Sequence, residues 1–281
     1  MPEVAVLASD LSSFLGKSRL TAVTFHGRSR LLGTIAPPTV RVALNSMVGG
    51  HLHFSSLGKW LTIASRSGSV KLHLGMTGQF LARKLRPEER DHLFVTWVFG
   101  DKRCHFIDVR RFARMYRDHP GMDWGLGGYS PASGFTLAPP EAVRERLRSQ
   151  FGGFQRVARI TWLLRFGRDT GVGNYLANEV LGELHLSPYD PCRNEAEAFR
   201  ILRRCQAIAR RSYRAGGTSF SNGYFRIDGT RGEFARRLDY YQNPNLERRR
   251  FQGRSVYSHF ASSALDPAPR CAPSARDCAR G

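Results

Sequence analysis

The chain of 281 residues has little that would suit an oxidising compartment or a membrane. Its five cysteines are odd in number, and none forms a Cys-x-x-Cys pair, which excludes a disulfide framework and a zinc ribbon. No apolar run approaches the length of a membrane span. The N-terminus also lacks the basic and apolar segments of a secretory signal. We therefore expect an intracellular protein that is not secreted, in a reducing compartment.

Acidic residues are scarce relative to basic ones. Lys and Arg number 43 against 23 Asp and Glu, which gives a formal net charge of +20. Such a field attracts polyanions, namely DNA, RNA or an acidic membrane surface. The alternative is a basic protein kept soluble by its charge. We favour a nucleic-acid partner.

The first part of the chain combines one helix with many short strands. Val4, Leu7 and Leu11 have helical spacing, and Gly16 is a candidate helix end. Segments rich in β-formers follow between residues 18 and 116, which predicts a sandwich or flattened barrel. These segments are Leu20–Phe25, Val40–Leu44, His51–Phe54, Lys59–Ile63, Val70–Leu74, Leu93–Phe99 and His105–Val109.

The second part of the chain has a helical pattern. Residues 118–140 are dense in Gly and Pro and predict a loop or linker. Strands are expected again over 224–260, where Gln252-Gly253 is a candidate hairpin turn. The tail from Ala261 has the composition of a disordered segment. The predicted helices are Glu141–Gln150, Val157–Phe166, Gly173–Leu184 and Glu195–Arg214.

Pro2 is the residue with the most distinctive chemistry. The initiator Met is usually removed before a small residue, and removal here would leave a secondary amine. Such an amine can attack C1′ of a sugar and form an iminium, and a reference pKa of about 7.7–8.0 leaves part of it unprotonated near neutrality. Glu3 beside it could carry protons. A structural explanation competes, because Pro is common at helix starts.

Other motifs suit contacts with phosphates and bases. Gly171-Val-Gly173-Asn174 opens a predicted helix, where glycine amides and a helix N-terminus can bind an anion. Met76, Arg110 and Phe112 follow strands, and such side chains can wedge into a base stack. Each motif also has an ordinary explanation, as a helix start, a core residue or a solvated charge.

Taken together, these motifs resemble the formamidopyrimidine-DNA glycosylase/endonuclease VIII family, over residues 1–260. The order and spacing of the motifs carry the resemblance, since each alone is weak. The matching motifs are Pro2-Glu3, Gly58-Lys59, His73-Leu-Gly-Met76, Asp108-Val-Arg-Arg-Phe112, Gly171-Val-Gly-Asn174-Tyr-Leu-Ala-Asn-Glu179, Ala215-Gly-Gly-Thr218 and Gly253-Arg-Ser-Val-Tyr257.

The resemblance implies a role for each matching residue. Pro2 would be the Schiff-base nucleophile, Glu3 its acid/base partner, and Lys59 a further residue of the catalytic group. Met76, Arg110 and Phe112 would fill the gap left by a flipped base, and 217–233 would form the loop near that base. The residues implied to grip phosphates are Lys59, His73, Asn174 and Arg254, together with the glycines Gly171 and Gly173.

The resemblance also implies an α+β fold. This fold is an N-terminal two-layered β-sandwich with an N-terminal helix, followed by a helical domain with a helix-two-turn-helix within 160–214. The expected divisions are a catalytic domain over 1–125, a linker over 126–150, the helix-two-turn-helix domain over 151–220, a hairpin region over 221–260, and a disordered tail over 261–281.

Two positions depart from the family pattern. Many members carry a four-cysteine zinc finger near the C-terminus, but residues 240–260 contain no Cys. The hairpin with Arg254 therefore resembles the zincless finger of the animal Nei-like branch, and we expect no metal and no cofactor. Val6 stands where the family usually has Glu, which leaves the preferred lesion open.

The sequence thus predicts a bifunctional DNA glycosylase and abasic-site lyase that excises oxidised bases by β,δ-elimination. The expected partner is double-stranded DNA with oxidised bases or abasic sites, bound by a monomer without membrane contact. It would work in the nucleus of a eukaryote or in the cytoplasm of a bacterium. The alternatives are an inactive damaged-DNA-binding protein of the same fold and a basic RNA-binding protein.

Overall fold

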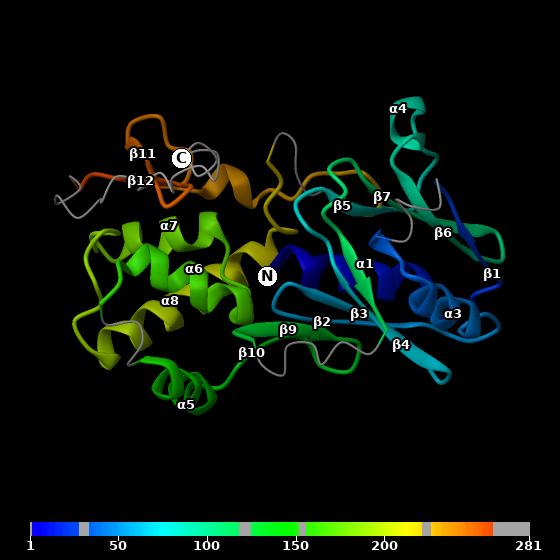
Figure 1. Cartoon of the computed structure of the whole chain (residues 1–281), viewed down its shortest axis with the longest axis horizontal. Coiled ribbons are helices and arrows are strands. Elements are labelled where there is room, and N and C mark those ends of the chain that lie inside the picture. Colours follow the sequence, from blue (N-terminus) through cyan, green and yellow to red (C-terminus); the bar gives the residue numbers. More distant parts are fainter. Residues whose placement is uncertain (1, 28–33, 118–124, 152–155, 221–225, 261–281) are drawn as a thin grey trace, which may run out of the picture.

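The computed structural model describes residues 2–27, 34–117, 125–151, 156–220 and 226–260, and the predicted tail lies outside them. The chain forms two halves, with strands gathered in one and helices in the other, and the N-terminal end lies between them (Figure 1). This arrangement confirms the predicted α+β fold, a sandwich followed by a helical part. Among the described residues, no helix is both long and apolar enough to cross a membrane.

The first half is a sandwich of two antiparallel sheets. One sheet has four strands in the order β1-β6-β7-β5, and the other has six in the order β10-β9-β2-β3-β4-β8. Their bounds are β1 (Ala22–Phe25), β2 (His53–Leu57), β3 (Trp60–Ser65), β4 (Gly68–His73), β5 (Gly78–Leu81), β6 (Leu93–Phe99), β7 (Lys102–Asp108), β8 (Arg114–Tyr116), β9 (Gly127–Ser130) and β10 (Gly134–Leu137).

Helix α1 (Pro2–Leu15) supplies one side of the sandwich core. Its apolar residues Leu7, Leu11 and Leu15 are fully or almost fully buried, as their spacing predicts. The helix packs on β2 and β9 of the six-stranded sheet and on a helix of the second half. The N-terminal end of α1 therefore lies at the junction of the two halves.

Two predictions for this half are wrong. Val40–Leu44 lies within helix α3 (Pro38–Ser46), where Pro38 starts the helix and Val40, Ala43 and Leu44 form its buried face. The β-branched composition of this segment misled the prediction, since helical spacing decided the outcome.

The predicted loop over 118–140 is wrong for Gly127–Leu137, which forms β9 and β10. A Cβ on Gly128 would lie 2.1 Å from the Ser56 carbonyl oxygen, so glycine permits this close strand approach. The division of the chain at residues 125 and 150 remains a proposal.

The second half is built on four helices and a hairpin. The helix predicted over Glu195–Arg214 is confirmed with those bounds, and the other three lie within a few residues of their predicted ends. The 3₁₀ turn η1 completes the described part of this half, whereas the short helix α4 belongs to the first half, between β5 and β6 (Figure 1). The bounds are α4 (Pro87–Arg90), α5 (Pro140–Phe151), α6 (Arg159–Thr170), α7 (Asn174–Glu183), α8 (Glu195–Arg214) and η1 (Phe234–Arg237).

The hairpin joins β11 (Glu247–Phe251) to β12 (Arg254–Ser258) through Gln252-Gly253, as predicted. Both turn residues have positive φ, 46° and 75°, which is the conformation of a tight two-residue hairpin. The prediction of strands is wrong for 226–246, where the chain forms turns, irregular segments and η1, with one isolated β-bridge at Glu233.

Glu179 of α7 holds the segment that leads to this hairpin. Its carboxylate accepts backbone N–H groups from Asp239, Tyr240 and Tyr241 at 2.6–3.1 Å. Burial raises the pKa of Glu179, and the three N–H donors oppose that rise. A buried carboxylate with several acceptor sites is suited to this role because all three partners are donors.

We expect Glu179→Gln to lower the free energy of unfolding by about 1–3 kcal/mol, because an amide NH₂ would face a backbone donor. Chemical denaturation monitored by circular dichroism measures this change. The control is Glu145→Gln on the exposed side of α5, expected to stay within about 0.5 kcal/mol of the wild type. Equal effects of the two substitutions would contradict the role of Glu179.

Candidate functional site

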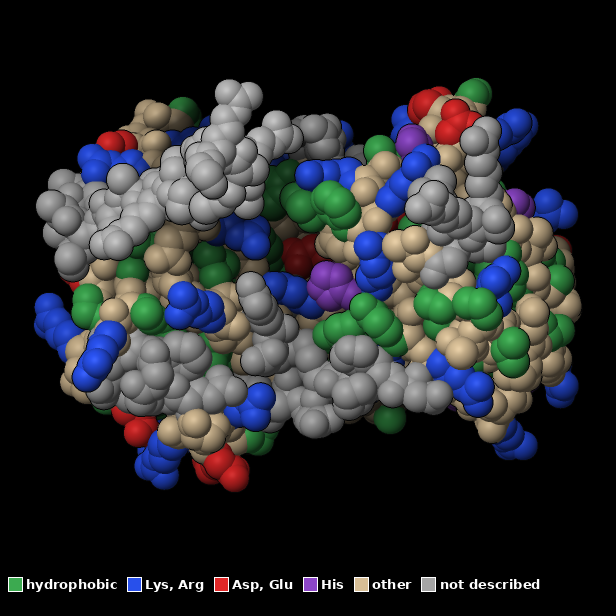
Figure 2. Space-filling view, in the orientation of Figure 1, with side chains coloured by type: hydrophobic (Ala, Val, Ile, Leu, Met, Phe, Trp, Pro, Cys, Tyr) green, Lys and Arg blue, Asp and Glu red, His purple; other side chains and the backbone are tan. Residues whose placement is uncertain are grey.

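A cavity of 480 Å³ lies at the junction of the two halves. In Figure 2 a hollow opens in the middle of the molecule, with basic and histidine side chains at its edge and an acidic group inside. Both halves contribute to the lining. The lining residues are Glu3, Val4, Lys59, His73, Leu74, Gly75, Met76, Thr77, Gly78, Gln79, Phe112, Gly171, Gly173, Tyr175, Leu176 and Arg254.

Most of the predicted site residues therefore meet at one place. A second cavity of 350 Å³ shares Lys59, Gly173 and Arg254 with the first and adds Asn174. We call the two adjoining cavities the central cleft. Pro2, the first residue of α1, is buried next to Glu3 and does not line either cavity. Arg110 is exposed outside both linings.

Lys59 ties the β2–β3 turn to the glycine motif of the second half. Its Nζ donates to the Val172 carbonyl at 3.0 Å, between Gly171 and Gly173. Gly171 ends α6 with a φ of 93°, and Gly173 precedes the first residue of α7. The ammonium group and the N-terminus of α7 thus lie together, which favours an anion at this point.

His73, at the end of β4, contributes a neutral imidazole. Its Nδ1 accepts the Gly75 backbone N–H at 3.2 Å, so the neutral ring carries its proton on Nε2. Burial and then the charge of Lys59 lower the pKa of His73. The side chain can therefore donate a hydrogen bond without carrying a charge at neutral pH.

The hairpin reaches the central cleft because α7 holds it. Asn174 Nδ2 donates to the Ser255 carbonyl at 3.0 Å, and Asn178 Oδ1 accepts the Tyr257 N–H at 2.8 Å. These bonds fix β12 and place Arg254 in both cavities. Asn174 Oδ1 is buried without a hydrogen-bond partner among the described residues. Asn174 is thus committed in part to the hairpin, a use that the sequence did not predict.

Met76 and Phe112 are exposed, by 61% and 48%, although both are large and apolar. Neither side chain belongs to the hydrophobic core, which was the alternative explanation for these two residues. The Arg110 guanidinium lies 5.0 Å from the centre of the Phe112 ring, a cation–π distance. The three predicted wedge residues therefore come from two loops that lie side by side.

Asp108 joins these two loops. Its Oδ1 accepts the Thr77 hydroxyl at 2.5 Å, and its Oδ2 accepts the Ala113 N–H at 2.7 Å. Gly75 permits the contact, because a Cβ there would lie 2.7 Å from the Phe112 carbonyl carbon. Asp108 belongs to one of the motifs found in the sequence. Its role in joining the two loops was not predicted, because its partner Thr77 is distant in sequence.

Tyr175 is the second residue that the sequence did not single out. Its buried hydroxyl donates to Glu3 Oε1 at 2.9 Å and links α7 to α1. Burial and then the charge of Glu3 raise the pKa of Tyr175 well above its ordinary value, so the phenol keeps its proton. Its ring packs edge-on against Phe220 and Tyr241. The Glu3 carboxylate is thus held from across the junction.

The resemblance described above predicts a hairpin without a zinc site. The hairpin and its approach, residues 240–260, contain no Cys. Within the described ranges, no group of three or more His, Cys, Asp or Glu side chains could hold a metal ion.

Comparisons with known proteins agree with this architecture. A sequence model of the formamidopyrimidine-DNA glycosylase N-terminal domain matches residues 1–115. A protein of Salinispora arenicola (strain CNS-205) named formamidopyrimidine-DNA glycosylase is 30% identical over 245 residues, covering 78% of this chain and 77% of its own. A protein of the same name from Thermus thermophilus is 30% identical over 229 residues, covering 75% and 81%.

Solved structures share the fold. The crystal structure of the MutM (Fpg) protein from Thermus thermophilus is 27% identical, with a TM-score of 0.67 over 92% of this chain and 96% of that one. Lactococcus lactis Fpg in complex with DNA that contains an abasic site has the same fold at 17% identity and a TM-score of 0.67, with the same coverage of both chains.

We expect the His73 ring to titrate below its ordinary value of about 6.5. Lys59→Met should raise the midpoint of this titration, because it removes a cation that disfavours the imidazolium. NMR titration of the histidine ring protons measures both values. Lys17→Met, at an exposed residue after α1, is the control and should leave the midpoint unchanged. A downward shift in Lys59→Met would disprove the electrostatic coupling.

Proposed function

Since the chain belongs to the formamidopyrimidine-DNA glycosylase family, we propose that it excises damaged bases through Pro2 and then cleaves the DNA strand. Two relatives at 30% identity, each matched over more than two thirds of both chains, carry the family assignment. The protein is accordingly a DNA glycosylase of base excision repair. The Schiff-base chemistry and the lyase step are the parts that we add.

The observation that carries the proposal is the position of α1. Its N-terminal end lies at the junction of the two halves, and Glu3 lines the same cavity as Lys59, His73 and Arg254. After removal of Met1, the Pro2 nitrogen would be a secondary amine at the N-terminus of a 14-residue helix. The helix dipole and nearby cations favour the unprotonated amine, which is the reactive form.

The reaction follows from this amine. Its lone pair attacks C1′ of an extruded deoxyribose, the bond to the damaged base breaks, and the base leaves with a proton. Ring opening gives an iminium between Pro2 and C1′. Loss of a C2′ proton then expels the 3′ phosphate, and a second elimination expels the 5′ phosphate. Glu3 is the proposed proton carrier, since it is the acidic residue in the lining of the main cavity.

The cations and amides of the central cleft suit the phosphates around the extruded nucleotide. Lys59 and Arg254 supply charge from opposite halves, and His73 supplies a neutral N–H. Gly171, Gly173 and Asn174 supply the start of a helix. Lys59 belongs to the catalytic group in this proposal, because it lies in the cavity that Glu3 also lines.

Met76, Arg110 and Phe112 are proposed to occupy the space that an extruded nucleotide leaves. Flipping a base costs a few kcal/mol, and apolar contacts with the exposed neighbours offset part of this cost. Exposed Met76 and Phe112 side chains bury little in the free protein and can bury more against bases. The preferred lesion stays open, since Val6 is buried in α1 and part of the loop predicted near the base lies outside the described residues.

The rival is a damaged-DNA-binding protein of the same fold without catalysis. Such a protein would need the basic cleft but neither a free Pro2 amine nor a held carboxylate. The hydrogen bond from Tyr175 to Glu3 favours the enzyme, because it positions an acidic side chain that DNA binding alone does not require.

Pro2→Gly should lower borohydride trapping of the covalent adduct with abasic duplex DNA by about tenfold or more, since it replaces the reacting amine. Affinity for uncut duplex should change much less. Pro38→Gly is the matched control, since Pro38 also starts a helix but lies in α3. Mass spectrometry first establishes that Met1 is absent. Undiminished trapping in Pro2→Gly would refute Pro2 as nucleophile, and binding without any wild-type adduct would favour the rival.

Tyr175→Phe should lower the single-turnover rate of base excision by about tenfold, the equivalent of one lost hydrogen bond of about 1.4 kcal/mol. Because Tyr175 acts through Glu3, duplex affinity should stay near the wild-type value. Tyr241→Phe removes a hydroxyl from the same aromatic cluster without touching Glu3, and it is the control. Parallel loss of affinity and thermal stability in Tyr175→Phe would indicate a purely structural role.

A further inference from the structure

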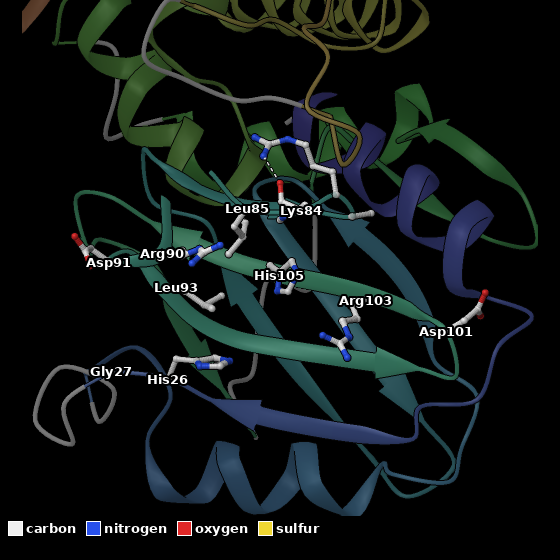
Figure 3. Close-up of a pocket in the computed structure, with 12 residues that line it drawn as sticks. His26, Gly27, Lys84, Leu85, Arg90, Asp91, Leu93, Asp101, Arg103 and His105 are labelled. Atoms are coloured by element: carbon white, nitrogen blue, oxygen red, sulfur yellow. Dashed lines mark hydrogen bonds between the residues drawn. The ribbon is translucent and has the colours of Figure 1, made fainter. Parts of the chain in front are cut away.

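A second depression, of 810 Å³, opens on the outer face of the four-stranded sheet, away from the sandwich core (Figure 3). Strand alternation explains its floor. In β7, Cys104 and Phe106 point into the core, while Arg103 and His105 point outward. Its residues come from β6, β7 and the turn between them, from the segments after β1 and after β5, and from the end of α4, and none of them lines the central cleft.

Two imidazoles in this depression share one hydroxyl group. His26 Nε2 lies 2.9 Å from Thr96 Oγ1, which lies 3.0 Å from His105 Nδ1. Burial is the main cause that lowers the pKa of both histidines, so the rings are neutral at pH 7. The hydroxyl has one proton to donate, so it can donate to at most one of the two rings, and the other ring then donates to it. The ring that accepts keeps its own N–H for a ligand.

The wall of the depression is held by an ion cluster. Glu89 of α4 accepts two hydrogen bonds from the Arg83 guanidinium and two more from the Arg86 guanidinium. The hydrogen bond from Arg83, ahead of those from Arg86, lowers the pKa of Glu89 to about 2. The buried carboxylate of this segment is therefore engaged in fixing the wall.

Three cations are left over in the same depression. Lys84, Arg90 and Arg103 line it and are exposed, and none makes an ion pair within the described ranges. Asp91 and Asp101 also line it, at opposite ends in Figure 3, which keeps the surface from being uniformly basic. Exposed cations of this kind can bind the phosphate oxygens of a DNA backbone. Such contacts do not depend on the base sequence.

We propose that this depression binds the phosphate backbone of a second DNA segment while the central cleft holds the first. The proposal goes beyond the excision reaction and rests only on the part of the proposed function that places DNA in the cleft. Strand β5 and the residues after it connect the sites, since Gln79 lines the cleft and Arg83, four residues later, lines the depression.

A second contact would change how the protein finds a lesion. A protein with one DNA site must release a segment before it meets another, whereas a protein with two can pass between segments. The formal net charge of +20 already favours contact with polyanions. An acidic protein segment could also bind to these exposed cations. The experiment below distinguishes such a partner from DNA.

The test uses the full chain with a short fluorescent duplex that contains a stable abasic analogue. Its dissociation rate is measured against rising concentrations of unlabelled plain duplex. We expect this rate to rise with competitor concentration in the wild type, because the second segment binds before the first leaves. In Arg90→Ser/Arg103→Ser the dependence should fall about fivefold or more, since two phosphate contacts are lost.

The matched control is Lys17→Ser/Arg66→Ser, which removes the same charge from exposed positions elsewhere and should behave as the wild type. A wild-type rate independent of competitor, or an unaltered dependence in Arg90→Ser/Arg103→Ser, would overturn the proposal. Equal acceleration by polyglutamate would also overturn it, in favour of an acidic protein partner. If the short duplex did not bind at all, the function proposed for the cleft would be wrong. This result differs from those that would overturn the second DNA site, so the failures of the two proposals are distinguishable.

Discussion

Several polar side chains on α7 are buried or half-buried, and they form hydrogen bonds with other segments of the protein. Tyr175 donates to Glu3 of the first helix, Glu179 accepts from three residues before the hairpin, and Asn174 and Asn178 hold the hairpin itself. One helix of ten residues thus connects three segments that are distant in sequence. The geometry of the central cleft depends on this helix, because the carboxylate and the hairpin arginine are both positioned from it.

The cleft combines a cation, a neutral imidazole and a protonated phenol. Lys59 is bonded to a backbone carbonyl, which leaves its charge intact, and His73 is kept neutral by burial and by that same lysine. The tyrosine above Glu3 is kept protonated. A phosphate that enters would meet positive charge from Lys59 and a neutral donor on His73, while the Glu3 carboxylate accepts the hydrogen bond of Tyr175.

The parts of this structure that follow a local pattern were predictable from the sequence. Helix α8 and the Gln252-Gly253 turn depend on periodicity and on residues that tolerate positive φ, and both were located correctly. Val40–Leu44 was misassigned because composition and spacing disagreed. Strand β9 was missed because its glycines, which favour a loop in sequence-based prediction, permit close approaches: Gly127 to its neighbour β10, and Gly128 to β2, which is distant in sequence.

The predicted site residues came from motif order, and most of them line one cleft. Pro2 and Arg110 lie outside that lining, and their roles remain proposals. The hydrogen bonds between Thr77 and Asp108 and between Tyr175 and Glu3 could not be predicted from sequence spacing. Their residues are 31 and 172 positions apart. Such contacts depend on packing between distant segments, which a single sequence does not display.

The hairpin that carries Arg254 is fastened by asparagine amides and a backbone carbonyl, without thiol ligands in its sequence. The three described cysteines are buried, and burial raises the pKa of each thiol, so little reactive thiolate is available. A hairpin tethered in this way has no sulfur atom between residues 240 and 260 for peroxide to attack. Oxidation of thiols therefore leaves the contacts that place Arg254 in the cleft unchanged.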